Sequence, residues 1–180
     1  MKKTRTTSTP YFSQSEFFET IKKGVKYDKN AELVERTYNY KSGAEYTGTW
    51  LGGFRHGKGV MKWNDGGTYY DGEWNYGYAE GQGSLHFSNG DNMKGQFRYN
   101  KLNGMGECFT ADTGYEHKGY WENDLQTGHG TEIWPDNSEY VGLYEFGKKE
   151  GFGKYSWPDD SYYLGEWKDN KICGLVIIDY

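Results

Sequence analysis

The sequence is poor in aliphatic residues. Leucine, isoleucine and valine together number 18, against 34 aromatic residues (7 Trp, 18 Tyr and 9 Phe), and the mean hydropathy is −1.02. So few aliphatic side chains cannot fill a thick core. Aromatic side chains each bury a large area, however, and can cover a thin sheet. The composition therefore predicts an ordered, thin β protein.

Proline and long apolar runs are also scarce. Three prolines beside 27 glycines favour tight turns, and the high aromatic content argues against disorder. No apolar run approaches the roughly 20 residues that span a bilayer. The basic residues 1–5 are not followed by the apolar segment of a secretory signal. We therefore expect an intracellular protein of the cytoplasm or cytoskeleton.

A motif of aromatic and glycine residues repeats along most of the chain. It is first seen as Tyr46-x-Gly48-x-Trp50, and its copies start at residues 46, 70, 93, 117, 140 and 163. A second landmark, Gly57-x-Gly59 in the first copy, follows each start at a constant offset. Such a period of 23 or 24 residues indicates a linear array in which each unit buries its apolar face on its neighbours.

Each unit has the pattern of a β-hairpin. Tyr46, Gly48 and Trp50 alternate with threonines, as in a strand with one covered face. Turn residues such as Asp65-Gly66 and Asn89-Gly90 then follow a second strand. The predicted fold class is all-β: an elongated, twisted antiparallel sheet of about six hairpin repeats and about twelve strands, with a short N-terminal helix and an extended arm.

The residues before the array differ in composition. Ser13 to Glu16 read as a capping box, which predicts a short helix at about 14–23 within an N-terminal arm of residues 1–34. Residues 35–45 resemble half a repeat and are expected to cap the array, which spans 46–180. Four apolar residues are predicted to anchor the arm: Phe12, Phe17, Phe18 and Ile21. The helix has two alternatives, its own array or a neighbouring molecule.

The charge divides at the same boundary. Residues 1–45 carry 9 basic and 6 acidic residues, a net +3, whereas residues 46–180 carry 12 and 20, a net −8. An acidic array predicts no nucleic-acid partner and disfavours anionic lipid, which a polybasic surface attracts. The basic residues near the helix and arm offer a weak lipid site: Lys2, Lys3, Arg5, Lys22 and Lys23.

The unit Tyr-x-Gly-x-Trp-x-x-Gly-x-x-His-Gly-x-Gly, complete from Tyr46 to Gly59, resembles the MORN (membrane occupation and recognition nexus) repeat. The resemblance covers residues 46–176. Later copies lack the motif histidine, and Asn100, Asp124 and Asn170 replace the middle glycine. The resemblance implies a scaffold in ciliary or other cytoskeletal assemblies or an adaptor for motor proteins, and it implies no reaction.

No local motif predicts catalysis, a metal or a cofactor. Gly52 to Lys58 mimics the start of a phosphate-binding loop, but Gly59 stands where a serine or threonine must ligate Mg²⁺. The four histidines do not share a ligand spacing. Cys108 and Cys173 occupy unrelated repeat positions, so neither a disulfide framework nor a metal clip is expected. We expect a non-enzyme.

Two surfaces are predicted to bind protein partners. The aromatic face suits a helical peptide, although the N-terminal helix is the alternative cover. The C-terminal strand is apolar and unprotected by charge, so a second chain is expected to cover it. The predicted partner-binding residues are Tyr46, Trp50, Tyr70, Trp74, Phe97, Trp121, Tyr144, Trp167, Val176 and Ile178. A third surface, the turn aspartates Asp65, Asp112, Asp136 and Asp159, is predicted chiefly to cap turns and secondarily to bind a basic partner.

The function that these features predict is a non-catalytic scaffold or adaptor that mediates protein–protein interaction as a subunit of a larger cytoskeletal or ciliary (axonemal) assembly. The alternative is a peripheral membrane-associated module that binds anionic phospholipid.

Overall fold

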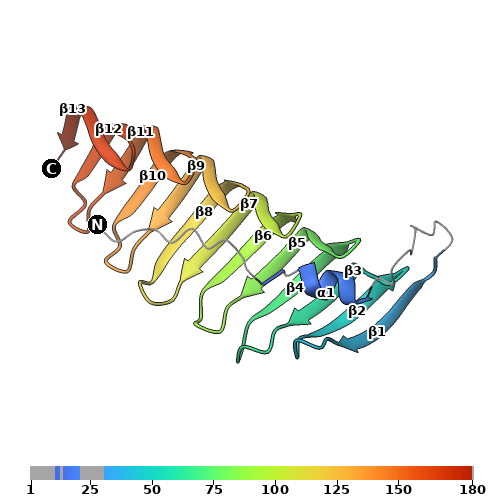
Figure 1. The fold of residues 1–180 in the computed structure, drawn as a ribbon. Coiled ribbons are helices and arrows are strands. Elements are labelled where there is room, and N and C mark those ends of the chain that lie inside the picture. Colours follow the sequence, from blue (N-terminus) through green and yellow to red (C-terminus); the bar gives the residue numbers. More distant parts are fainter. Residues whose placement is uncertain (1–10, 13, 21–30, 180) are drawn as a thin grey trace. The chain divides into compact units, whose positions relative to one another are not determined.

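The computed structural model describes residues 11–12, 14–20 and 31–179, without the side chains of 175–179. Thirteen strands form an antiparallel sheet in which the strand order follows the sequence (Figure 1). The elements are α1 (Gln14–Thr20), β1 (Leu33–Asn39), β2 (Glu45–Leu51), β3 (Phe54–Lys62), β4 (Tyr69–Asn75), β5 (Tyr78–His86), β6 (Asn92–Arg98), β7 (Lys101–Thr110), β8 (Tyr115–Glu122), β9 (Leu125–Ile133), β10 (Glu139–Glu145), β11 (Lys148–Ser156), β12 (Tyr162–Lys168) and β13 (Lys171–Asp179).

The predicted fold class is confirmed, with thirteen strands rather than about twelve. Strand β1 pairs with the whole of β2, in the region expected to cap the array. Helix α1 lies within the predicted range of 14–23, whose last three residues fall outside the described part of the chain, as does the arm before residue 11. The domain boundaries at residues 34 and 45 stay predictions.

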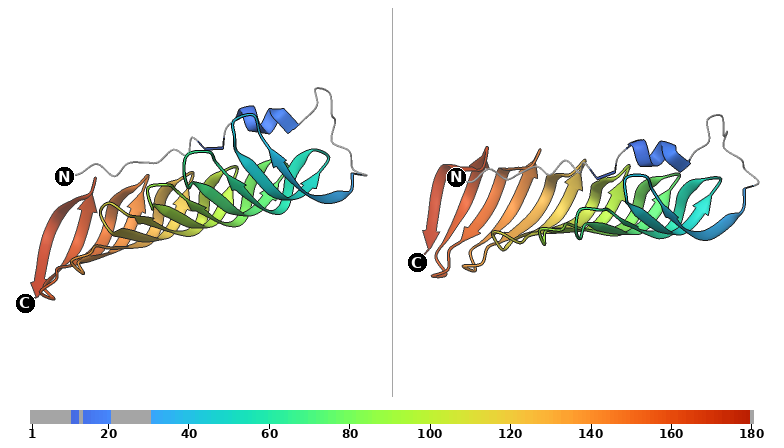
Figure 2. Two further views of the ribbon diagram at one scale, coloured as in Figure 1. Left: turned by 90° about the horizontal axis from the view of Figure 1, so that it is seen from below. Right: turned by 60° about the horizontal axis from the view of Figure 1, so that its bottom comes forward.

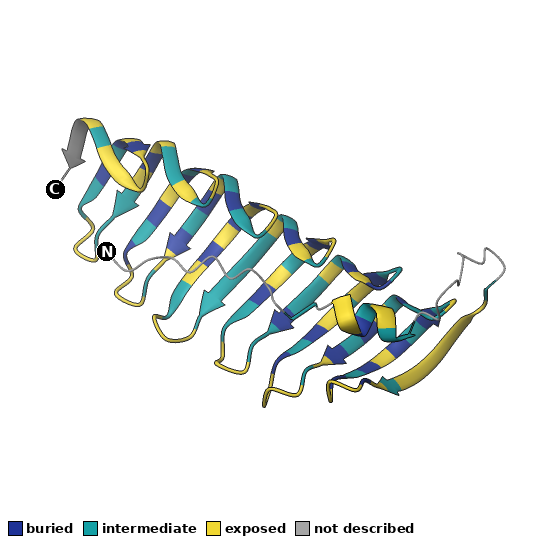
Figure 3. Cartoon of the chain, in the orientation of Figure 1, coloured by how far each residue is buried: buried dark blue, intermediate teal, exposed yellow. Residues whose placement is uncertain are grey.

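The chain divides into two compact units. Of the described residues, the N-terminal unit contains 11–90 and 96–101, and the C-terminal unit contains 91–95 and 102–179. Buried residues alternate with more exposed ones along strands such as β2 and β10 (Figure 3), as expected for a sheet with one covered face, whereas β1 is exposed along most of its length.

A row of glycines crosses each unit at the middle of its strands. In the N-terminal unit Gly48 pairs with Gly59, Gly59 with Gly72, and Gly72 with Gly83. The corresponding row of the C-terminal unit contains Gly106, Gly119, Gly130, Gly142, Gly153 and Gly165. Because these residues have no side chain, the row leaves a channel over the backbone that a flat ring can occupy.

The motif tyrosine fills this channel. An added Cβ at Gly72 would lie 2.5 Å from the Tyr70 hydroxyl, and one at Gly83 would lie closer still. The Tyr70 hydroxyl donates a hydrogen bond to the Glu73 carbonyl at 3.2 Å. Glu73 is skipped in the pairing of β4 with β5 at a β-bulge, so the tyrosine satisfies a carbonyl that this ladder leaves free.

In the copies that have the motif tryptophan, its side chain joins the hairpin to the preceding one. Trp74 Nε1 donates to the Gly59 carbonyl at 2.9 Å, and Trp167 Nε1 repeats this bond with Gly153 at 3.2 Å. The Trp74 ring also meets Tyr46 and Tyr70 edge-on, with centroids 5.3 and 5.1 Å away. Edge-to-face packing is a favoured aromatic geometry. Each tyrosine thus contacts the large residue of its own repeat and that of the next.

The substitutions of the middle motif glycine fit the same backbone. Asn100, Asp124 and Asn170 have φ of 68°, 69° and 64°, a left-handed conformation that asparagine and aspartate tolerate. Each side chain also accepts a hydrogen bond from a backbone N–H of the preceding repeat, as Asn100 Oδ1 does from Ala79 N at 2.7 Å. These replacements therefore add a bond between repeats.

The turn aspartates serve their own turns. Asp136 accepts hydrogen bonds from the backbone N–H and hydroxyl of Ser138, and Asp159 does the same with Ser161. These bonds lower the pKa of both carboxyl groups. The arrangement agrees with the local turn role expected for aspartate.

Replacing Gly83 with alanine should destabilise the N-terminal unit by about 1–3 kcal/mol, because the new methyl group overlaps the Tyr70 ring. Urea unfolding followed by circular dichroism measures the change. The matched control is Gln82→Ala, an exposed neighbour on the same strand, which should stay within about 0.5 kcal/mol of the parent. Equal effects of the two substitutions would contradict the tyrosine–glycine packing.

Candidate functional site: the aromatic face of the sheet

We use the term aromatic face for the side of the sheet that carries the motif tyrosines and tryptophans. In the N-terminal unit its predicted partner-binding residues are no more than 2% exposed: Tyr46, Trp50, Tyr70, Trp74 and Phe97. In the C-terminal unit Trp121, Tyr144 and Trp167 are also buried, and the side chains of Val176 and Ile178 lie outside the described part. These rings form the core of the sheet. A partner protein would therefore contact the residues that cover the rings rather than the rings themselves.

Residues 11–12 and 14–20 lie on the aromatic face of the N-terminal unit (Figure 2). The Phe12 ring contacts Trp63, Tyr70 and Trp74 at centroid distances of 5.3, 5.6 and 5.9 Å. Its neighbour Tyr11 packs on Trp63 as well. The chain therefore covers part of this face with its own N-terminal segment, which was one of the two alternatives for the helix.

Helix α1 adds a second group of contacts. Phe17 packs against Phe54 and Tyr78 at 6.0 and 5.3 Å, and its ring lies directly over Gly77. Phe18, in contrast, is 62% exposed. Of the four residues predicted to anchor the arm, Phe12 and Phe17 thus contact the array, Phe18 faces outward, and Ile21 lies outside the described residues.

A buried arginine lies below the helix. The Arg55 guanidinium donates to the Gly77 carbonyl at 2.9 Å and stacks over the Trp74 ring at 4.5 Å. Burial lowers the pKa of Arg55, and the charges of Tyr40 and Glu16 act in the opposite direction. A buried cation is costly without an anion nearby. The carboxyl group of Glu16 in α1, itself 4% exposed, acts on Arg55 through space and forms no direct ion pair with it.

Two glutamates hold the helix through polar contacts. Glu16 Oε1 accepts a hydrogen bond from the Ser42 hydroxyl at 2.8 Å. Glu19 accepts from the Lys41 backbone N–H at 3.1 Å and from the Tyr38 hydroxyl at 3.3 Å. The segment is therefore docked by aromatic insertion and by carboxylates that meet donors of β1 and the turn after it.

The C-terminal unit carries a cation at the same repeat position. Lys149 and Arg55 both lie nine residues after their motif starts, where the other copies have Ala79, Leu102, Gln126 and Ile172. The Lys149 ammonium lies 4.8 Å from the centroids of the Trp134 and Tyr140 rings. It also donates a hydrogen bond to the Glu132 carboxylate. Glu132 also accepts from the Tyr115 hydroxyl at 2.7 Å. Sequence reasoning missed both cations, although a charge at a repeat position that is apolar in three other copies is a readable signal.

His117 occupies the tyrosine position of the fourth copy and is buried. Its ring meets Trp121 and Tyr144 edge-on at 5.1 and 4.9 Å, as a tyrosine would. Within the described part of the chain neither ring nitrogen has a hydrogen-bond partner, and the Glu132 carboxylate lies 3.9 Å from Nδ1. Burial lowers the pKa of His117 to about 4, so the ring is neutral at pH 7.

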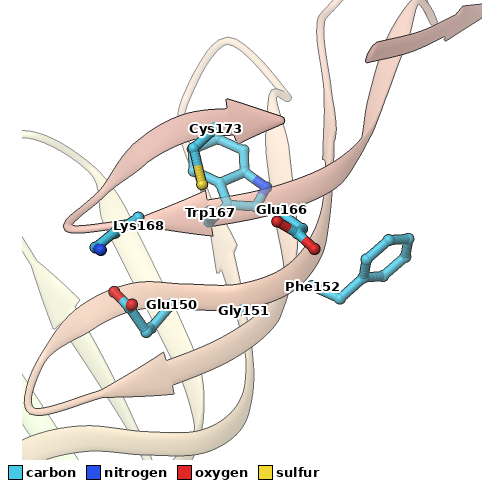
Figure 4. A pocket seen from close by; sticks show the side chains of 7 residues that line it. All are labelled: Glu150, Gly151, Phe152, Glu166, Trp167, Lys168 and Cys173. Atoms are coloured by element: carbon cyan, nitrogen blue, oxygen red, sulfur yellow. The ribbon is translucent and has the colours of Figure 1, made fainter. Parts of the chain in front are cut away.

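The C-terminal unit also has a shallow cavity of about 280 Å³ (Figure 4). Its lining comes from β11, β12 and β13: Glu150, Gly151, Phe152, Glu166, Trp167, Lys168 and Cys173. Glu150 already accepts a hydrogen bond from the Asp169 backbone, and the lining holds no histidine that could activate the thiol. This arrangement offers no catalytic set.

The remaining candidates for chemistry fit no site in the described residues. Burial raises the pKa of the Cys108 thiol to about 12, which keeps it protonated and unreactive. Among residues 11–12, 14–20 and 31–179, no three histidine, cysteine or acidic side chains form a group that could hold a metal ion. Nor is any described helix both long and apolar enough to cross a membrane.

The comparisons with known proteins agree with this architecture. The MORN repeat model matches six segments: residues 46–68, 70–92, 94–114, 117–139, 140–162 and 163–175. The chain belongs to the MORN repeat family. The resemblance inferred from the motif is thereby confirmed.

Two individual proteins show more distant similarity. Alsin from Rattus norvegicus is 31% identical over 116 residues, which cover 61% of this chain and 6% of alsin. A solved structure of the SAS-4 TCP domain in complex with a proline-rich motif of Ana2, from Drosophila melanogaster, aligns with a TM-score of 0.40 and 14% identity, over 72% of this chain and 63% of that one. The second similarity is too low to support an argument.

Replacing His117 with tyrosine should stabilise the protein and reduce its acid sensitivity. Between pH 6.5 and about 4 the unfolded chain binds a proton at this histidine and the folded chain does not, so stability present above pH 6.5 is lost as the pH falls. The loss is on the order of 2–3 kcal/mol. Unfolding free energies measured from pH 7 to 4 give the difference between parent and variant.

The control for this experiment is His129→Gln, which removes an exposed histidine of the same hairpin. That variant should retain the pH dependence of the parent. If the unfolding free energies of His117→Tyr and the parent fell by the same amount between pH 7 and 4, the conclusion that His117 is buried in its neutral form would be wrong.

Proposed function

We propose that this MORN-repeat chain is a non-catalytic scaffold or adaptor that binds proteins through the aromatic face of its array. The docked segment, residues 11–12 and 14–20, carries the proposal, because this face accommodates a short stretch of chain through inserted rings and hydrogen-bonded carboxylates. Helix-in-groove recognition uses the same elements. The proposed setting is a larger cytoskeletal or ciliary assembly within the cell.

The aromatic face of the C-terminal unit provides a place for such a partner. Trp134, Tyr155 and Trp157 are only partly buried there, and they rest on a buried aromatic cluster that includes Tyr140 and Trp167. Large aromatic residues on a rigid support are the side chains that most often dominate protein–protein binding energy. The net charge of −8 on residues 46–180 disfavours an anionic lipid surface as the ligand.

The test compares two variants of the tagged full chain in cross-linking and affinity capture from its native cells. Tyr155→Ser with Trp157→Ser removes two rings from the aromatic face. Phe146→Ser with Phe152→Ser, the matched control, removes two rings that are 73% and 56% exposed. A protein captured by the parent and the control, but reduced at least tenfold with the face variant, supports the proposal once circular dichroism shows that both variants are folded.

The opposite pattern, with capture lost only in the control, would contradict the use of the aromatic face. Sedimentation with phosphatidylserine vesicles at physiological salt tests the alternative membrane role. Binding to these vesicles without any captured protein would favour the lipid-binding module over the scaffold.

A further inference from the structure

The two units complete their aromatic faces in different ways. At the repeat position 15 residues after the motif start, the C-terminal unit has Glu132 and Tyr155 besides Cys108 and Ile178, whereas the N-terminal unit has Met61 and Leu85. Glu132 and Tyr155 supply a carboxylate and an aromatic ring to the face. In the N-terminal unit no residue at this position supplies either group.

The aromatic ring of the N-terminal unit comes from the segment instead. Tyr155 packs on Trp134, Trp157 and Trp167 at centroid distances of 5.6, 5.0 and 6.3 Å. Phe12 makes the comparable set of contacts with Trp63, Tyr70 and Trp74. A residue of the sheet fills one aromatic site, and a residue of the N-terminal segment fills the other.

The carboxylate also comes from the sheet in the C-terminal unit and from the N-terminal segment in the N-terminal unit. Lys149 of β11 is paired with Glu132 of β9, across the intervening strand β10, a contact made entirely within the sheet. Arg55, at the corresponding position, has no such partner in the sheet, and the nearby carboxyl group that raises its pKa is Glu16 of α1. The N-terminal unit therefore has a binding site for one ring and one anion, four residues apart in the segment that occupies it.

The segment fits this site incompletely. Glu16 Oε2 and Trp63 Nε1 are buried, and within the described part of the chain neither has a hydrogen-bond partner. Unsatisfied buried polar groups weaken an interface. In addition, α1 lies on the face without extending the hydrogen-bonded sheet. Of its two adjacent phenylalanines, Phe18 remains exposed. A ligand that offers an acceptor to Trp63 Nε1 would bind this face better than residues 11–20 do.

We propose that the aromatic face of the N-terminal unit is an exchangeable docking site, which residues 11–20 occupy until a partner protein replaces them. The partner segment has an aromatic residue, a glutamate four residues later and a second aromatic residue next to it, the pattern of Phe12, Glu16 and Phe17. The aromatic rings enter between Trp63, Trp74 and Phe54, and the glutamate faces Arg55. This inference rests on the proposed function and names the chemistry of its partner.

Competition from the tethered segment has a measurable consequence. A segment linked to its own site acts at an effective concentration on the order of millimolar, so a free peptide binds the parent weakly. Phe12→Ala with Phe17→Ala should open the site. The probe is a fluorescein-labelled synthetic peptide of residues 8–23, followed by fluorescence anisotropy on full-length protein.

The opened variant should bind this peptide at least tenfold more tightly than the parent does. A peptide with Phe12→Ser should bind at least tenfold more weakly, and one with Glu16→Gln several-fold more weakly. The same affinity for parent and opened variant, or for all three peptides, would overturn the proposal. So would unfolding of the N-terminal unit in the opened variant, because residues 11–20 would then be an obligatory part of its core.

Light scattering, which measures the molar mass of the parent in solution, tests whether a second copy of the chain occupies the site. A dimer that disappears in the opened variant would assign the site to a second copy of the chain and overturn the assignment to a partner protein. Failure of the peptide to bind, combined with face-dependent capture by the C-terminal unit, would reject exchange alone and leave the scaffold function standing.

Discussion

A tyrosine ring that lies over two glycines of facing strands sets the geometry of each regular repeat. The glycines permit this contact because any Cβ at Gly72 or Gly83 would overlap the Tyr70 hydroxyl. The hydroxyl in turn satisfies the carbonyl at the adjacent bulge. The tryptophan of the next hairpin can then pack edge-on against the ring. A sheet with few aliphatic residues thus obtains a continuous core from aromatic contacts between neighbouring repeats.

The same construction explains why the aromatic face can serve as a binding surface. Its deepest rings are occupied by contacts within the sheet, so binding depends on the layer above them. In the C-terminal unit Tyr155 and the Glu132–Lys149 pair belong to that layer. In the N-terminal unit Phe12 and Glu16 take these roles from outside the sheet. Differences at a few repeat positions therefore explain why the sheet covers the aromatic face of the C-terminal unit with its own residues, whereas the N-terminal unit uses the N-terminal segment.

Most of the fold could be predicted because the repeat is periodic and its glycines and turns have few structural alternatives. The hairpin repeats and the short helix follow from such local patterns, whereas the pairing of glycine with glycine across the strands is seen only in the structure. The position of residues 11–20 could not be predicted in this way, since it depends on contacts between Phe12 and rings more than 50 residues away in sequence, such as Trp63. The sequence marks Arg55 and Lys149 as charges at an unusual repeat position, but it does not show that they stack on rings such as Trp74 and Trp134.

A double-mutant cycle between Tyr46 and Trp74 tests the coupling of adjacent repeats most directly. The two rings belong to the first and second copies, and their centroids are 5.3 Å apart. Unfolding free energies of Tyr46→Leu, Trp74→Leu and the double variant should reveal a favourable interaction of about 0.5–1.5 kcal/mol. Strictly additive effects of the two substitutions would contradict the account, because the rings would then stabilise their own hairpins without joining them.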